Sequence, residues 1–80
     1  MTYADAISKR LLILCKEKNI TTNHLATLSG ITQSTLQDVI TGKTKNPKLK
    51  TLHKISIGLN MTLSELLDFP EMNNTLFDDE

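Results

Sequence analysis

Apolar residues recur along this chain at intervals of three and four, the spacing that places them on one face of a helix. In the first segment, Ile7, Leu11 and Leu14 follow this spacing, and apolar neighbours widen the stripe until most of the helix would be covered. The pattern predicts a helix over residues 4–18, which the polar run at 16–19 brings to an end.

Two short helices joined by a tight turn are expected next. The Thr21 hydroxyl is suited to capping the first of them, because it can accept a hydrogen bond from an amide of the first turn. Gly30 accepts the left-handed dihedral angles that often close a helix. Thr32 can then cap a second helix over residues 33–41. Its apolar face would consist of Leu36, Val39 and Ile40. Two short helices around a four-residue turn predict a helix-turn-helix at residues 22–41.

The rest of the chain predicts a loop, two further helices and a tail. Residues 42–48 are a loop by composition, and apolar spacing indicates a helix over 49–59. The Thr-Leu-Ser-Glu sequence at 62–65 has the form of a capping box and opens a fifth helix. No segment is typical of a strand. We therefore expect one all-α domain of five short helices over residues 1–69, and an acidic, disordered tail at 70–80.

Length and composition agree with a small cytoplasmic protein. Eighty residues suffice for one compact domain, and the single cysteine, Cys15, excludes an internal disulfide. The chain contains no apolar run near the roughly 20 residues of a membrane span, and its start has no signal-peptide pattern. These features predict a cytoplasmic protein with no membrane partner.

The formal net charge of zero hides a strong asymmetry. All nine Lys and Arg residues lie between Lys9 and Lys54, whereas five of the nine acids lie in the last thirteen residues. Residues 1–67 therefore carry nine positive and four negative charges, a net charge of +5. This excess is compatible with binding to nucleic acid, in which phosphate attraction supplies most of the non-specific affinity.

Candidate catalytic and metal-binding groups are few and scattered. His24, His53 and Cys15 fall on separate predicted helices and form neither a close His pair nor a Cys-x-x-Cys motif. No glycine-rich phosphate loop follows a strand. The sequence predicts no enzyme, no metal site and no cofactor.

The sequence resembles the phage repressor and Cro family of helix-turn-helix domains, also called the Xre family. The resemblance covers residues 7–67. Its motifs are Leu25-Ala26, Gly30-Ile31-Thr32-Gln33-Ser34-Thr35-Leu36, Gly42-Lys43, Asn46-Pro47, Leu49, Thr51-Leu52, Ile55 and the stretch from Leu59 to Leu67. It implies a lambda-repressor-like fold and a transcription regulator, most simply a repressor, that binds double-stranded DNA.

Two positions depart from the pattern of the family. Many members pair an Arg near the end of helix 1 with a Glu late in helix 3, and the matching residues here are Cys15 and Ile40. An apolar pair avoids the desolvation cost of a buried ion pair, so we expect no loss of stability. Many members also have a phosphate-binding Gln where this chain has Thr22, whose shorter hydroxyl makes a weaker anchor.

The resemblance further implies that the helix at 33–41 lies in the major groove. Gln33 is the best candidate for reading a base, because its amide can make a bidentate contact with adenine. Ser34, Gln37 and Asp38 share its face. A carboxylate near phosphates is repelled, so Asp38 either accepts from a cytosine amino group or is an exposed charge without a specific role.

Phosphate contacts are expected on both sides of that helix. One DNA strand would be held by Thr22, Asn23 and Thr35. The other would be held by Lys43, Thr44, Lys45, Asn46 and Lys48. A lysine-rich loop is by itself typical of a solvated surface, but directly after a recognition helix it predicts a phosphate clamp.

The family commonly binds as a symmetric dimer with half-sites about 34 Å apart. Candidate dimer residues are Met61, Leu67, Phe69 and Met72, although packing on the core of the monomer would explain them equally well. Leu76 and Phe77 could dock on a partner or belong to a disordered tail. The alternative function is a protein-interaction module, such as an antitoxin or regulator subunit. Neutral overall charge, Asp38 and the apolar tail residues favour it.

Overall fold

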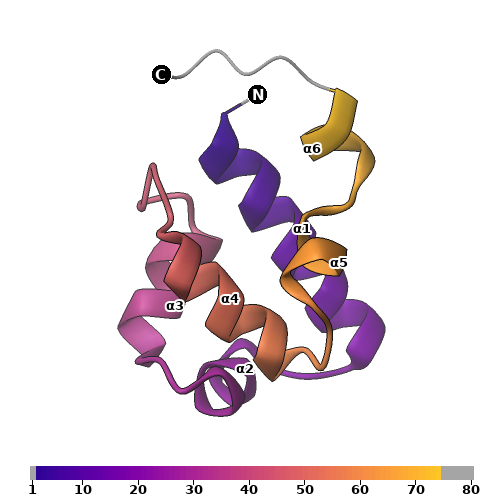
Figure 1. Ribbon diagram of the computed structural model, residues 1–80. Helices are drawn as coiled ribbons and strands as arrows, with labels where there is room; N and C mark the ends of the chain where they lie inside the picture. Colours follow the sequence, from indigo (N-terminus) through magenta and orange to yellow (C-terminus); the bar gives the residue numbers. More distant parts are fainter. Residues whose placement is uncertain (1, 75–80) are drawn as a thin grey trace.

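The computed structural model describes residues 2–74, which form six helices and no strand (Figure 1). The helices are α1 Tyr3–Lys18, α2 Thr22–Ser29, α3 Gln33–Ile40, α4 Leu49–Gly58, α5 Leu63–Leu67 and α6 Pro70–Asn74. The predicted all-α fold class is confirmed, and the first five helices begin and end close to their expected positions. Within the described residues, no helix combines the length and apolar character that crossing a bilayer requires.

The ends of α1 are set by local polar groups. The Thr2 hydroxyl accepts a hydrogen bond of 3.1 Å from the Asp5 amide, which starts the helix at Tyr3. Asp5 in the first turn and lysines in the last turn complement the helix dipole. Asn19 then takes a left-handed conformation, with φ of 54°, and closes the helix.

The core lies where α1, α2, α3 and α4 meet. Leu11, Leu25, Leu36 and Ile55 each expose at most 1% of their surface, and each such side chain contributes about 1.5–3 kcal/mol by leaving water. The other members of the cluster are Ala6, Ile7, Leu14, Cys15, Ala26, Val39, Ile40, Leu52, Leu59, Leu66 and Phe69. Since Cys15 and Ile40 are both in this cluster, apolar burial replaces the ion pair that many family members have at these positions.

The predicted helix-turn-helix at residues 22–41 is confirmed by α2 and α3. The Thr21 hydroxyl accepts from the His24 amide at 3.1 Å, and the Thr32 hydroxyl accepts from the Thr35 amide at the same distance. Between them, Gly30 has a φ of 69°, which an L side chain rarely adopts, and its amide donates to carbonyls at the end of α2. The turn therefore depends on two threonine caps and one glycine.

A close approach of backbones joins α2 to α4. A Cβ placed on Gly58 would overlap the Ser29 hydroxyl and would lie only 3.0 Å from the Ser29 amide nitrogen. Ser29 is itself buried, and among residues 2–74 its hydroxyl has no hydrogen-bond partner. The contact thus requires glycine at position 58, for reasons of space rather than of backbone angle.

Residues 70–74 correct the sequence-based expectation. They form α6, whereas no regular structure was expected from Pro70 onward. Proline is well suited to the first turn of a helix, where its missing N–H would have no partner. The Asn73 side chain donates to the Asp68 carboxylate at 2.8 Å, and Lys9 of α1 forms an ion pair of 3.1 Å with Glu71. The rest of the expected tail, residues 75–80, lies outside the described residues.

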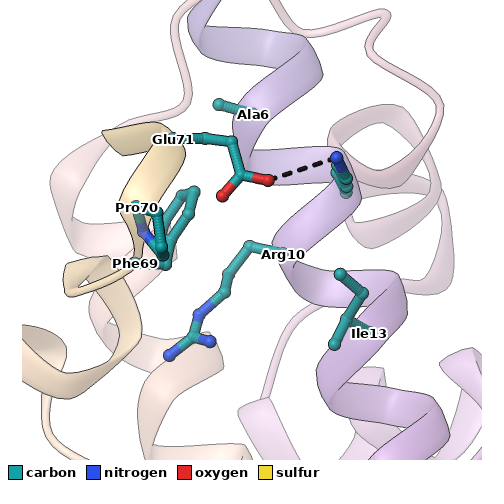
Figure 2. A pocket seen from close by; sticks show the side chains of 7 residues that line it. Ala6, Arg10, Ile13, Phe69, Pro70 and Glu71 are labelled. Atoms are coloured by element: carbon teal, nitrogen blue, oxygen red, sulfur yellow. Dashed lines mark ion pairs between the residues drawn. The ribbon is translucent and has the colours of Figure 1, made fainter. Parts of the chain in front are cut away.

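Arg10 of α1 joins the C-terminal segments to the core. Its Nε donates to the Leu66 carbonyl at 3.1 Å and its Nη2 donates to the Glu65 carbonyl at 2.9 Å, both near the end of α5. The guanidinium carbon lies 5.2 Å from the centre of the Phe69 ring. Figure 2 shows Arg10 extending below Phe69, with the ion pair of Glu71 above it. The Arg10 guanidinium therefore donates to two carbonyls near the end of α5 and also makes a cation–π contact with Phe69.

Candidate nucleic-acid interface

The outward face of α3 presents short polar side chains on a rigid support. Gln33, Ser34 and Gln37 are exposed, and Asp38 is half-buried. Leu36, Val39 and Ile40 on the opposite face are buried in the core. At the end of the helix, the Ser8 hydroxyl of α1 donates to the Ile40 carbonyl. The four candidate base-reading residues therefore lie on a short helix that is held at its cap, its core face and its last carbonyl.

The segment after α3 folds back toward the helix. We call residues 43–48 the lysine loop, because Lys43, Lys45 and Lys48 are all exposed there. The Thr44 amide donates to the Asp38 carbonyl at 3.0 Å, which fixes the start of the loop against α3. Asp38 thus has a structural role through its backbone, whatever its carboxylate contacts.

A hollow of about 230 Å³ lies between α3, the lysine loop and the first turn of α4. Its lining is Thr35, Val39, Thr44, Asn46, Pro47, Lys48 and Thr51. Four candidate phosphate-binding residues therefore share one site, and Thr35 belongs with the loop residues rather than with the start of α2. Thr51, in the first turn of α4, also lines the hollow. The sequence analysis did not single it out, because its position in a predicted helix gave no sign of this placement.

The Thr35 side chain is prepared to donate within this hollow. The Thr32 hydroxyl donates to the Thr35 hydroxyl oxygen at 2.8 Å while accepting from the Thr35 amide. The proton of the Thr35 hydroxyl is then available for an acceptor such as a phosphate oxygen. The cap that starts α3 therefore also orients a candidate phosphate ligand.

The start of α2 supplies the other candidate anchors. Asn23 is exposed and Thr22 is half-buried, both in the first turn after the Thr21 cap. Amides in the first turn of a helix have no partner within the helix, so an anion can bind there. The two expected phosphate ligands at this end are accordingly placed at a helix N-terminus.

The segment that carries this face is rich in positive charge. Between residues 33 and 54 the chain has five lysines and a single acid, Asp38.

The histidines and the cysteine give no sign of metal binding or catalysis among the described residues. His24 and His53 are exposed on α2 and α4. Within residues 2–74, no three His, Cys, Asp or Glu side chains are grouped as metal ligands would be. Burial raises the pKa of the Cys15 thiol, which keeps that group in its unreactive form.

The candidate dimer residues are less exposed to solvent than a free dimer surface requires. Phe69 is 6% exposed and belongs to the core, which is the alternative explanation that the sequence left open for it. Met61, Leu67 and Met72 are half-buried and pack against the core. Ile57, which was not among the expected residues, is 63% exposed and lines a hollow together with Met61. The apolar surface near α5 is thus centred on the end of α4.

Comparison with known proteins agrees with this geometry. The model of the Cro/C1-type HTH DNA-binding domain matches residues 10–71. The crystal structure of the prophage Lp1 protein 11 is similar to this chain, with a TM-score of 0.82 and 32% sequence identity, over 94% of this chain and 99% of that chain. No curated protein gives a match. The chain belongs to the Cro/C1-type helix-turn-helix DNA-binding domain family, whose role is the regulation of transcription.

Proposed function

We propose that this protein is a sequence-specific repressor that inserts α3 into the major groove of its operator. The supporting observation is the arrangement of the exposed face of α3 directly beside the lysine loop and the shared hollow. Base edges would face Gln33, Ser34, Gln37 and Asp38. Repression requires only that the operator be occupied, and the protein would act in the cytoplasm.

Phosphate contacts would flank the recognition helix on both sides. The first turn of α2, with Thr22 and Asn23, would hold one strand. The other strand would contact the hollow and the lysine loop through Thr35, Lys43, Thr44, Lys45, Asn46 and Lys48. Because phosphates position the protein and base edges specify the sequence, the two groups should respond differently to substitution.

A salt titration on duplex DNA tests the proposal. The operator is first selected from a random duplex pool, and binding is then measured on that operator and on a scrambled duplex. Affinity should fall steeply as salt rises. Gln33→Ala should lose about 1–3 kcal/mol of preference for the operator. Lys45→Ala should weaken both duplexes alike and reduce the salt slope by about 1. A chain that binds no duplex even at low salt contradicts the proposal.

We further propose that two copies bind a palindromic operator. The exposed Ile57 and the half-buried Met61 support a contact through the α4–α5 corner. In a symmetric dimer the same patch meets itself, and each α3 reads one half-site about 34 Å from the other. Equilibrium sedimentation of the chain with a selected duplex would give the number of copies bound.

A protein-interaction module is the second candidate function. Leu12 and Ile13 are adjacent on α1 and are 49% and 42% exposed. Exposed apolar neighbours can mark a contact with another protein. Under this alternative, substitution of Gln33 and Lys45 would leave binding to the partner protein unchanged, whereas Ile13→Glu would abolish that binding.

A further inference from the structure

The charges of α4 and α5 are divided at Ile57. Lys50 and Lys54 precede it on α4, whereas Glu65 and Asp68 follow it, at and directly after α5. Residues 49–56 contain no acid, and residues 58–68 contain no Lys, Arg or His. The exposed side chain of Ile57 is therefore an apolar centre between a basic segment and an acidic one.

The two sides lie close to this centre. α5 packs beside α4 (Figure 1). Ile57 lines a hollow of about 330 Å³ together with Met61 and Glu65, which lie toward the end of α4 and on α5. Lys54 is three positions before Ile57, so both share a face of α4 and are about 4.5 Å apart along its axis. A base and an acid thus flank Ile57 on its two sides.

The Glu65 carboxylate is fixed in place and has an oxygen to spare. Its Oε1 accepts from the Thr62 amide at 2.9 Å in the capping box of α5. Within residues 2–74 it forms no ion pair, and the charge of Lys18 acts on it without direct contact. A side chain that is already held loses little conformational freedom when it binds a second partner. Glu65 is therefore well placed to accept an ammonium group.

We propose that two copies of this chain meet at Ile57 in a two-fold register, in which Lys54 of each copy forms an ion pair with the partner's Glu65. The inference rests on the proposed dimer and deepens it, because it fixes which charges face each other. Groups on opposite sides of a two-fold axis exchange partners, so an axis at Ile57 forms this pair twice. Registers that bring the two basic sides together are disfavoured by repulsion.

The sign of one substitution tests the register. Glu65→Gln removes the charge but keeps a side chain that can complete a capping box. In the parent it should loosen the dimer of the full chain about 2- to 10-fold, because two attractive pairs are lost. In a Lys54→Glu background it should tighten the dimer by a similar factor, because a repulsion between carboxylates is relieved. Sedimentation equilibrium at about 50 mM salt measures both effects, and about 0.5 M salt should reduce each to less than about twofold.

A matched lysine separates a direct pair from overall charge. Lys16 is exposed on α1, and Lys16→Glu changes the charge of the chain by the same amount as Lys54→Glu. In the Lys16→Glu background, Glu65→Gln should still loosen the dimer. A sign that reverses in both backgrounds, or in neither, overturns the proposed register.

Mixing two variants shows whether the pair joins two copies. The Lys54→Glu protein, labelled with ¹⁵N, is mixed in equal amount with the unlabelled Glu65→Gln protein, and native mass spectrometry counts the dimers. The mixed dimer has one attractive pair and no repulsive pair, so it should form more than half of all dimers. A share of half or less assigns the coupling to a contact within one chain and overturns the proposal.

The outcomes separate this register from the proposed function. If Ile57→Glu dissociates the dimer while the effect of Glu65→Gln keeps one sign, the dimer stands and the register fails. If the chain is monomeric both free and on the selected duplex, dimer and register both fail and DNA binding by one copy stands. If the sign reverses as expected but no variant binds duplex DNA, the contact stands and the proposed repressor function fails.

Discussion

At the scale of single residues, Gly58 is the glycine whose missing side chain allows the closest approach of a neighbouring element. A glycine within a helix normally costs about 0.5–1 kcal/mol relative to alanine, so propensity alone would favour replacement. Here the missing side chain allows the backbone of α4 to approach Ser29 of α2. Two effects of opposite sign therefore act at one position, and the steric effect is the larger.

We expect Gly58→Ala to lower the free energy of unfolding by about 1–3 kcal/mol, the usual cost of overpacking a core contact. Urea denaturation would measure the loss. In a Ser29→Ala background the cost should become smaller, because the overlapping hydroxyl is absent while the Ser29 amide nitrogen, 3.0 Å away, remains. A stabilised Gly58→Ala protein would show that α2 and α4 separate easily and that the contact is not restrictive.

The capping box of α5 supports a prediction about pH. The Glu65 side chain accepts from the Thr62 amide at 2.9 Å, and the Thr62 hydroxyl accepts from the Glu65 amide at 3.0 Å. The hydrogen bond from the Thr62 amide lowers the pKa of the Glu65 carboxyl most in the folded chain, and the Thr62 side chain and, to a smaller extent, the charge of Lys18 lower it further. The stabilisation is thus present above the ordinary Glu range and is lost as pH falls through the lower, folded pKa.

NMR titration of the Glu65 carboxyl should therefore give a pKa below that of an unstructured Glu. Thr62→Ala removes the hydroxyl acceptor and weakens the cap, so the pKa should move back toward its ordinary value. Thr21→Ala, which removes the cap of a different helix, is the control and should leave the Glu65 pKa unchanged. An unaltered pKa in Thr62→Ala would mean that the Thr62 hydroxyl does not contribute to the lowered pKa of this carboxyl.

At the scale of elements, the first five helices could be predicted because their signals are local. Thr21, Thr32 and Thr62 each precede an apolar pattern and act as the expected caps. The start of α6 has no such pattern, and its position depends on partners more than fifty residues earlier, Lys9 and Arg10. The same distinction decides how much of the candidate site could be predicted. The exposed face of α3 follows from local periodicity, whereas the grouping of Thr35 with Thr51 depends on how the lysine loop folds back.

The contribution of Arg10 to this long-range packing can be measured. Arg10→Ala removes two hydrogen bonds to α5 carbonyls and the contact with Phe69, and each charged hydrogen bond is worth about 1.5–3 kcal/mol. We expect a loss of about 2–4 kcal/mol and faster hydrogen exchange in α5 and α6 than in α2. Arg10→Lys should rescue little, because an ammonium lacks the planar fork. Lys9→Ala, which breaks only the exposed ion pair with Glu71, should cost less than about 1 kcal/mol.

At the scale of the whole molecule, the residues that stabilise the fold are different from the residues that we propose contact DNA or a second copy. The core joins α1 to α4 and extends to Phe69, while the face of α3, the lysine loop and Ile57 remain outside it. Substitutions in these exposed regions should therefore change binding with little change in folding. This separation allows the dimer proposal to be tested without unfolding the protein.

Ile57→Glu is the decisive substitution for the dimer. Since Ile57 is 63% exposed, the free energy of unfolding should change by no more than about 0.5 kcal/mol. In a symmetric contact each copy would place a carboxylate against the other, so two charges would be buried without partners. Sedimentation should then show one copy on a single half-site and no cooperative binding to the palindrome. Leu12→Glu, at an apolar position of similar exposure on α1, should retain cooperative binding. Cooperative binding by Ile57→Glu together with its loss in Leu12→Glu would move the dimer surface from the α4–α5 corner to α1.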